Sequence, residues 1–342
     1  MYGGREHRRP GKQLGIDMRL AILSDLHVLG PGEHEQTNEY LRTLGDDDSR
    51  VKRRVRRGLN RVRNRFWHSH PEARAACFVQ ALEQVSAFNP EWVVVNGDYA
   101  GDHLGVGLSD DHTFESAHHV VDLIREVFPA RSIFNFGDHD IGKYNTVRRC
   151  GGIRLKSLER GNQLGLQSFW KREYHGHMLI GVNSSLITLD LFLPEALTEE
   201  VDTWRELQRE HLKLIRETFA ALPADEKVVV FCHDPAAITR LDEIPEVRAV
   251  KDQIQCTVIG HLHSPFLLRW TQWMRHLPVL HGAYPIARIV SHGAQGAKTW
   301  SGYRPVVCPS TYGVGNHVSG GVLFIEENPV GDIHITQKRI TI

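Results

Sequence analysis

The chain has 342 residues, of which 41% are hydrophobic, so it is long enough to bury a large core and its composition argues against disorder. Its 41 basic and 41 acidic side chains cancel, so net charge predicts neither a general affinity for nucleic acid nor an acidic partner. The five cysteines stand far apart with no C-x-x-C pair, which favours buried thiols in a reducing compartment.

The N-terminal segment, residues 1–17, is polar and rich in glycine and arginine. We expect it to be a disordered leader and residues 18–342 to form a single domain. No stretch of the sequence reaches the length of about 18 apolar residues that spans a bilayer, and the N-terminus lacks the apolar core of a secretory signal. A cytoplasmic protein is expected.

Strands and helices are predicted to alternate through most of the chain. Apolar runs predict strands at 20–23, 92–96, 132–136, 227–232 and 257–259, and periodic apolar positions predict helices at 71–88, about 114–128 and about 198–222. This alternation indicates parallel strands with right-handed crossovers. From residue 277 onward, short strand-like pieces at 278–280, 287–290, 306–307, 321–325 and 333–340 are separated by glycine-rich turns, which predicts a sheet that finishes antiparallel.

Carboxylate and imidazole side chains follow five of the predicted strands directly. The five fragments are Asp25-Leu26-His27, Gly97-Asp98, Gly137-Asp138-His139-Asp140, His233-Asp234 and Gly260-His261-Leu262-His263. Sites in open α/β sheets are built at the carboxyl ends of strands, so we expect these side chains to share one pocket. Two divalent ions about 3.5–4 Å apart, joined by a shared carboxylate, suit phosphoester hydrolysis, and Asp98 is the candidate for the shared ligand. The mixed ligands favour Mn, Fe or Zn over Mg or Ca.

The order and spacing of these fragments resemble the calcineurin-like metallophosphoesterase superfamily, whose pattern is D-x-H, G-D, G-N-H-D/E, a lone H and G-H-x-H. The match covers about residues 18–340 and is closest to the bacterial phosphodiesterase-type branch. The resemblance implies a four-layer α/β/β/α sandwich of two mixed sheets flanked by helices. It also implies hydrolysis of a phosphate ester by a water that two metal ions activate. Asp25, His27 and His263 would then complete one ion's ligands beside Asp98, and Asp138, His233 and His261 the other's.

His139 adjoins a metal ligand without needing to be one. By the same resemblance it is the general acid that protonates the leaving-group oxygen. Many relatives carry an acidic residue three positions after the shared aspartate to support this histidine, and here that position is Gly101. Asp102, one residue later, is the candidate for this role, and Asp140 is the alternative.

Asp138 is the largest departure from the pattern, because relatives usually carry asparagine there. Replacing a neutral amide by an anion lowers the charge of the dinuclear centre by one unit. We therefore expect tighter cation binding and a weaker Lewis acid.

Two segments are predicted as insertions, at about residues 30–70 and 141–177, both near the pocket mouth because they follow metal-binding loops. The first contains an arginine-rich helical stripe, residues 50–67, that ends in Phe66 and Trp67. Three interpretations stay open for it: a solvated helix packed on the domain, a helix on an anionic membrane surface that would make the protein peripheral, and, less favoured, contact with nucleic acid.

The sequence leaves two functions open. The first is an enzyme, a phosphoric monoester or diester hydrolase that acts on a phosphoester substrate. The second is a non-catalytic scaffold that uses the same fold to bind metal or phosphate, and the intact His139 argues against it.

Overall fold

The computed structural model describes residues 18–36, 54, 58, 71–102, 104–144, 150–262, 268–269, 296, 299–312, 320–328 and 332–340. The predicted leader, nearly all of the stripe 50–67 and the predicted strands at 278–280 and 287–290 lie outside these residues. Among the described residues, no helix combines the length and the apolar character that crossing a membrane requires.

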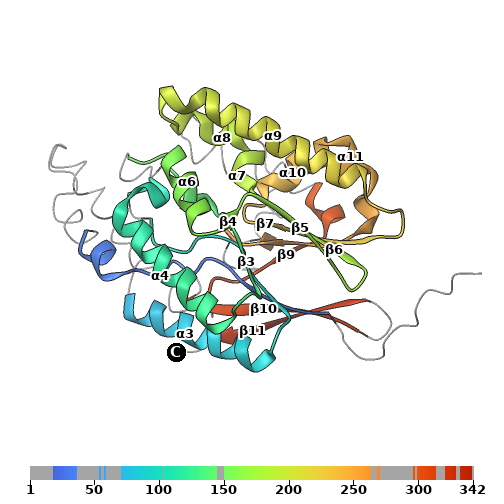
Figure 1. Ribbon diagram of the computed structural model, residues 1–342, viewed down its shortest axis with the longest axis horizontal. Coiled ribbons are helices and arrows are strands. Elements are labelled where there is room, and N and C mark those ends of the chain that lie inside the picture. Colours follow the sequence, from blue (N-terminus) through green and yellow to red (C-terminus); the bar gives the residue numbers. More distant parts are fainter. Residues whose placement is uncertain are drawn as a thin grey trace, which may run out of the picture.

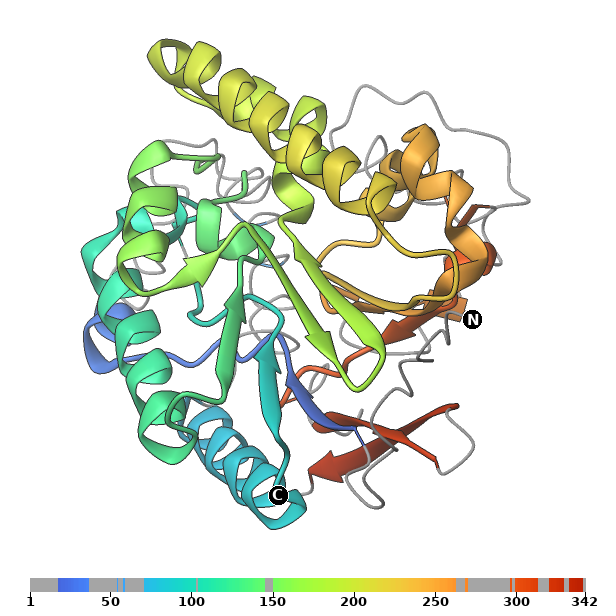
Figure 2. The same cartoon turned by 45° about the vertical axis from the view of Figure 1, so that its right-hand side comes forward.

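The strands form two sheets. The strands are β1 (Arg19–Leu23), β2 (Trp92–Val95), β3 (Ser132–Asn135), β4 (Leu166–Gln167), β5 (Phe169–Tyr174), β6 (His177–Val182), β7 (Lys227–Cys232), β8 (Ile254–Ile259), β9 (Pro305–Val307), β10 (Gly320–Glu327) and β11 (Ile333–Ile340). The first sheet has the order β11-β10-β1-β2-β3-β4 and the second the order β5-β6-β7-β8-β9. Figure 2 shows β1, β2 and β3 side by side in the first sheet.

Both sheets are mixed. β1 to β4 are parallel, with Ile22 opposite Val94, whereas β10 and β11 add an antiparallel edge. In the second sheet β6 to β9 are parallel and β5 is antiparallel to β6. The expectation of an antiparallel finish is confirmed for β10 and β11 but is wrong for β9, which runs parallel to β8. The connection from Ile259 to Pro305 is long enough for a crossover, and only a short hairpin would have required an antiparallel return.

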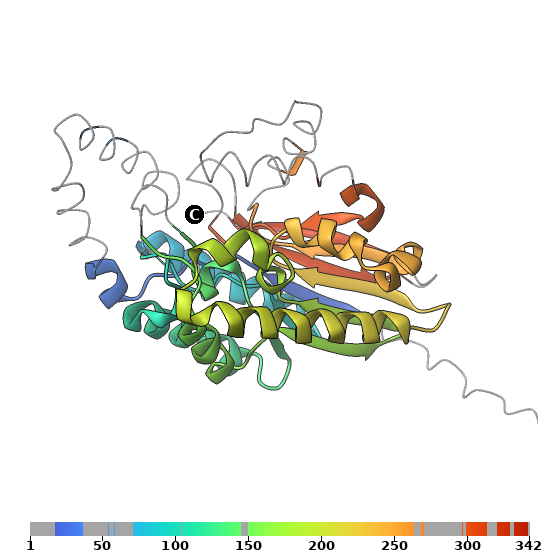
Figure 3. The same ribbon diagram turned by 90° about the horizontal axis from the view of Figure 1, so that it is seen from above.

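Helices cover the outer face of each sheet. The longer helices are α3 (Pro71–Phe88), α4 (Asp111–Val127), α6 (Leu155–Gln163), α9 (Val201–Ala220) and α10 (Ala236–Glu243), and the shorter ones are α5 (Asp138–Ile141), α7 (Ser184–Ile187), α8 (Leu189–Phe192) and α11 (Pro245–Ala249). Single 3-10 turns lie at Gly107–Ser109, Leu193–Glu195, Thr198–Glu200, Lys251–Gln253 and Ser301–Tyr303. Figure 1 shows α3 and α4 on one side of the strands and α9, α10 and α11 on the other, and Figure 3 shows α9 as one long helix.

Three hydrophobic clusters fill the spaces between these layers. The middle cluster joins the facing surfaces of the two sheets and includes Ile22, Val94, Val229 and Phe231. The other two lie between each sheet and its helices. The architecture is therefore a four-layer α/β/β/α sandwich, as the family resemblance implies.

Helix boundaries follow local chemistry. α3 has the predicted bounds. α4 begins three residues earlier than predicted because Asp110 caps it, with its carboxylate accepting a hydrogen bond from the Thr113 backbone N–H at 2.9 Å. Residues 198–200, expected as helix, form the 3-10 turn that precedes α9.

The segment predicted as a second insertion, residues 141–177, contains structural elements of the core. It supplies α6, then β4 at the edge of the first sheet and β5 at the edge of the second. β4 is only two residues long, and β5 exposes Lys171, Arg172 and Glu173. Neither therefore carries the apolar run by which the predicted strands are recognised. β6, which follows them, was also not predicted, although its sequence is apolar and mostly buried.

Candidate metal centre

The predicted fragments follow parallel strands of both sheets. Asp25 and His27 come after β1, Asp98 after β2, Asp138 and His139 at the start of α5 after β3, His233 after β7 and His261 after β8. The structure gathers their ligand atoms into three groups, each within 4.8 Å: Asp25, His27 and Asp98; Asp98, Asp138 and His139; and Asp138, His233 and His261. His263 lies outside the described residues, as does His103.

Asp98 lies at the centre of this arrangement. Its Oδ2 atom is 3.7 Å from Nε2 of His27 and 3.1 Å from Nε2 of His233. Oδ1 of Asp25 is 3.9 Å from each of the same two imidazole nitrogens. The Asp25, Asp98 and His233 side chains are inaccessible to solvent or nearly so. Asp98 therefore lies close to an imidazole that follows a strand of the first sheet and to one that follows a strand of the second.

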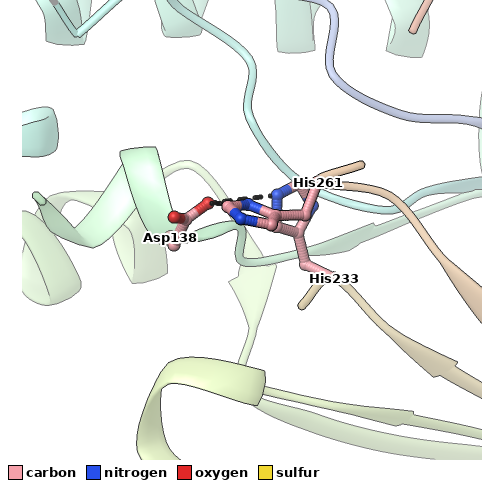
Figure 4. A group of neighbouring side chains, drawn as sticks. All are labelled: Asp138, His233 and His261. Carbon is pink, nitrogen blue, oxygen red and sulfur yellow. Dashed lines mark hydrogen bonds and ion pairs between the residues drawn. The ribbon is translucent and has the colours of Figure 1, made fainter. Parts of the chain in front are cut away.

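Asp138 presents one oxygen to two histidines from the second sheet. Its Oδ1 atom is 3.2 Å from Nε2 of His233 and 3.2 Å from Nδ1 of His261 (Figure 4). The carboxylate comes from the first turn of α5, after β3, while the imidazoles come from the loops after β7 and β8. This group therefore joins the two sheets.

The backbone fixes the orientation of two imidazole rings. Nδ1 of His233 is 2.7 Å from the Asn96 carbonyl oxygen, and Nδ1 of His27 is 3.1 Å from the Ala100 carbonyl oxygen. A carbonyl can only accept, so Nδ1 carries the proton in both rings and Nε2 faces the carboxylates. Histidines that bind metals are commonly oriented in this way.

The donor set fits divalent cations. Among the described residues, the buried atoms Oδ2 of Asp98 and Nε2 of His233 have no hydrogen-bond partner, although they lie 3.1 Å apart. Burial opposes protonation of His233, but the carboxylates of Asp98 and Asp25 outweigh it and raise its pKa well above the usual value. Burial alone would raise the pKa of Asp98, and His233 holds it below its usual value. Without a cation, a proton must therefore supply positive charge among these carboxylates.

The loops that carry these side chains have unusual backbone conformations. Positive φ angles occur at Asp25 (51°), His27 (44°), Asp98 (61°), Asp102 (44°) and His261 (47°). Such conformations are costly for residues other than glycine and concentrate at functional sites. Gly97 itself has φ of 96°, and a Cβ atom there would lie 2.4 Å from the Gly137 backbone nitrogen. The glycine of the G-D fragment is therefore required by space as well as by φ.

His139 contacts Asp102, not Asp140. Its Nδ1 atom is 3.3 Å from Oδ2 of Asp102, whose Oδ1 accepts a hydrogen bond from the Gly107 N–H at 2.8 Å. The His139 backbone N–H donates to Oδ1 of Asp98 at 3.0 Å. Burial opposes protonation of His139, but the carboxylates of Asp98, Asp102 and Asp138 outweigh it and raise its pKa to about 9. In the metal-free chain His139 is therefore protonated at neutral pH.

Asp140 has a structural role that the sequence did not reveal. Its carboxylate accepts hydrogen bonds from the backbone N–H groups of Asp98 at 2.9 Å, Tyr99 at 3.1 Å and Gly137 at 2.7 Å. Burial and the nearby Asp98 raise the Asp140 pKa to about 7. The side chain ties the loop after β2 to the loop after β3. The helix α5 that places Asp140 was not predicted, so no signal in the sequence indicated this role.

A polar network lies between the sheets near the site. The Asn135 side-chain N–H donates to Oδ1 of Asn96 at 2.8 Å, and Asn96 donates to the carbonyl oxygen of Cys232 at 3.2 Å. Trp170 donates its indole N–H to Oδ1 of Asn135. These bonds connect β3 to the ends of β2 and β7, so they fix the relative position of the loops that carry Asp98 and His233.

Lys143 pairs with Asp138 and was missed at the sequence level. Its Nζ atom donates to Oδ2 of Asp138, on the side of the carboxylate away from the atom that faces the histidines. The expectation of a more negative centre considered Asp138 alone. It did not include the positive charge that Lys143, five residues later, places beside this carboxylate.

The fold and the site define a class of protein, an α/β sandwich with candidate metal ligands, carboxylates and imidazoles, at the ends of its strands. The chain matches the family model for calcineurin-like phosphoesterases over residues 18–265 and belongs to that family, so it is a metallophosphoesterase. The family typically binds two divalent metal ions, for which the structure provides candidate ligand clusters.

Two solved structures are similar at low sequence identity. One is a dimetal phosphatase from Danio rerio, with 12% identity and a TM-score of 0.44, covering 95% of this chain and 98% of that one. The other is the phosphopantetheinyl hydrolase from Mycobacterium tuberculosis, with 15% identity and a TM-score of 0.34, covering 74% of this chain and 85% of that one. The search of curated proteins gave no match.

Proposed function

We propose that this chain hydrolyses a phosphate ester with two divalent metal ions, Mn, Fe or Zn in preference to Mg. Asp25, His27 and His263 would hold one ion, Asp138, His233 and His261 the other, and Asp98 both. The observation that carries the proposal is the position of Asp98 Oδ2, 3.7 Å from Nε2 of His27 and 3.1 Å from Nε2 of His233. The part assigned to His263 rests on the sequence pattern.

The metal ions, when bound, neutralise the phosphoryl oxygens and lower the pKa of an attacking water. The protein contributes a rigid set of ligands. Asp140 fixes the backbone on either side of Asp98, and the Asn96 carbonyl fixes the His233 ring. Preorganised ligands of this kind need no rearrangement when charge develops in the transition state.

His139 acts as the general acid in this proposal. Asp102 accepts a hydrogen bond from Nδ1–H of His139 and so holds the ring. The proton on Nε2 is then free to pass to the leaving-group oxygen as the ester bond breaks. The pKa of about 9 keeps His139 protonated at neutral pH in the metal-free chain. Asp102 touches no reacting atom and is a positioning residue.

Hydrolysis of p-nitrophenyl phosphate and of its bis-ester tests the enzyme against the scaffold. The protein is treated with a chelator, dialysed and supplied with Mn²⁺. We expect turnover of at least one ester by the wild type and a loss of about 100-fold or more for Asp98→Ala. His118→Gln, which changes an exposed histidine on α4, is the matched control and should keep full activity. A metal-loaded wild type inert to both esters would favour the scaffold.

The leaving group tests His139 separately. Phenolate is a poorer leaving group than p-nitrophenolate and needs its proton more. His139→Gln should therefore lose roughly tenfold more activity on phenyl phosphate esters than on p-nitrophenyl esters. Equal losses on the two leaving groups would remove the general-acid role while leaving the metal centre intact.

Membrane and nucleic-acid contacts concern the stripe 50–67 and stay predictions, as does a cytoplasmic location. Co-sedimentation with vesicles, with and without anionic lipid, tests the membrane interpretation. Binding to DNA or RNA that weakens steeply with salt would favour the nucleic-acid interpretation instead.

A further inference from the structure

The two oxygens of Asp138 have different partners. Oδ1 lies 3.2 Å from both His233 Nε2 and His261 Nδ1, while Oδ2 accepts a hydrogen bond from Nζ of Lys143. Asp138 is fully buried as a side chain, and the Lys143 side chain is 24% exposed. The carboxylate thus faces the candidate ligands on one side and a cation of the protein on the other.

This division matches the chemistry of the asparagine that the family pattern has at this position. An amide offers one acceptor oxygen and one donor nitrogen, whereas a carboxylate offers two acceptors and a negative charge. The second oxygen of Asp138 therefore needs a donor, and the charge needs compensation. Lys143 supplies both.

The backbone holds Lys143 in place for this contact. Gly142, with φ of 109°, turns the chain after α5, and a Cβ atom there would lie 2.4 Å from the Gly152 carbonyl oxygen. The Lys143 backbone N–H then donates to the Gly105 carbonyl oxygen at 3.0 Å. The backbone of Lys143 is therefore held at a position from which its ammonium group reaches Asp138.

We propose that Lys143 is a positioning residue that offsets the charge of Asp138 and holds its Oδ1 atom toward His233 and His261. The proposal rests on the proposed function in one respect, that Asp138 is a cation ligand. The sequence alone predicts a centre with one extra negative charge. With Lys143 included, the net charge of the centre equals that of a site with asparagine at this position.

Each single substitution should then unbalance the centre. Lys143→Met leaves an uncompensated carboxylate beside the cation. Asp138→Asn removes the negative charge and sets an amide N–H₂ group against the ammonium of Lys143, so that two donors face each other. The double variant Asp138→Asn/Lys143→Met should restore balance, because both members of the pair are neutral.

The test is a cycle of wild type, the two single variants and the double variant, each stripped of metal and titrated with Mn²⁺ in a calorimeter. We expect Lys143→Met to lower the Mn²⁺ Kd about tenfold and Asp138→Asn to raise it about tenfold, with the double variant within about threefold of wild type. Lys156→Met is the matched control, because this more exposed lysine pairs with Asp111 on the surface. Its Kd should not change. A Kd for Lys143→Met equal to wild type, with the double variant equal to Asp138→Asn, would overturn the proposal.

Urea unfolding of the four proteins in the presence of a chelator measures the coupling between Asp138 and Lys143 without any metal. If the pair is coupled, the shift in urea midpoint for the double variant is smaller than the sum of the two single shifts. Additive shifts would overturn it. A wild type that binds no Mn²⁺ and hydrolyses no ester would refute the proposed function instead, and the unfolding cycle would then decide the pairing by itself.

Discussion

Glu33 is a buried acid whose ionisation should weaken the fold. It lies in a helical segment, residues 31–36, with no solvent-exposed surface, and its Oε2 atom is 3.4 Å from the Gly101 backbone nitrogen that donates to it. Burial raises the pKa of this carboxyl from its ordinary value of 4.5 to about 8, with a smaller contribution from Asp102. Glu33→Gln keeps the shape and removes the ionisation.

The sign and size of the effect follow from proton linkage. Between pH 4.5 and about 8 the folded protein holds a proton that the unfolded chain releases, so stability falls as pH rises through this window. From about pH 5.5 to about pH 8.5 the wild type should lose about 3 kcal/mol through this group, and relaxation of the surroundings makes this an upper figure. Glu33→Gln should not show this loss.

Urea unfolding of both proteins in a chelator at the two pH values measures the difference. Other titrating groups contribute equally to both proteins and cancel. Glu35→Gln, an exposed glutamate in the same segment, is the matched control and should retain the wild-type pH dependence. If Glu33→Gln lost as much stability as wild type between the two pH values, the argument that Glu33 is protonated in the fold would be wrong.

Three further predictions concern the metal centre. Asp140→Ala leaves three buried backbone N–H groups without an acceptor and should lower the free energy of unfolding by about 3 kcal/mol. A decrease below about 1 kcal/mol, measured by urea unfolding, would contradict the role of Asp140 as a link between loops. Gly97→Ala should lower the free energy of unfolding by about 3 kcal/mol or more, because the new Cβ atom would clash with the Gly137 backbone. The measurement is a lower urea midpoint or insoluble protein, and a variant as stable as wild type would show that the loop can move. Free Mn²⁺ at about 100 times its Kd should stabilise the metal-free protein by about 2.7 kcal/mol, and an unchanged thermal midpoint would exclude a site formed only in the folded state.

Long apolar runs made most of the fold predictable from the sequence. The α3 helix and the β2 and β7 strands have strong periodic or continuous apolar patterns, and their bounds agree closely with the prediction. β4 and β5 were not predictable, because an edge strand needs no second apolar face and β4 has only two residues. The direction of β9 also could not be predicted, since a strand's sequence does not encode which way its neighbour runs.

The candidate site was predictable to the extent that strand ends determine it. Parallel strands bring their carboxyl ends to one edge of a sheet, so the convergence of Asp25 and Asp98 follows from the pairing of β1 with β2. His233 follows β7 of the second sheet, and its approach to them depends on how the two sheets pack. The contacts of Lys143 and Asp140 do not follow from the strand topology. They depend on how the Gly142 turn and the first turn of α5 direct single side chains, and neither contact has a signature in sequence spacing.

The proposed ligands in the described part of the chain are divided between the two sheets, with Asp25, His27, Asp98 and Asp138 from the first and His233 and His261 from the second. A nascent chain that has formed β1 to β3 but not β7 and β8 would therefore have only part of the chelating set. Tight cation binding would then require that about three-quarters of the polypeptide has been synthesised and that the two sheets have packed together. Cation retention would then report that the sandwich has been assembled correctly, and a truncated or misdocked chain would reveal itself by releasing its ions.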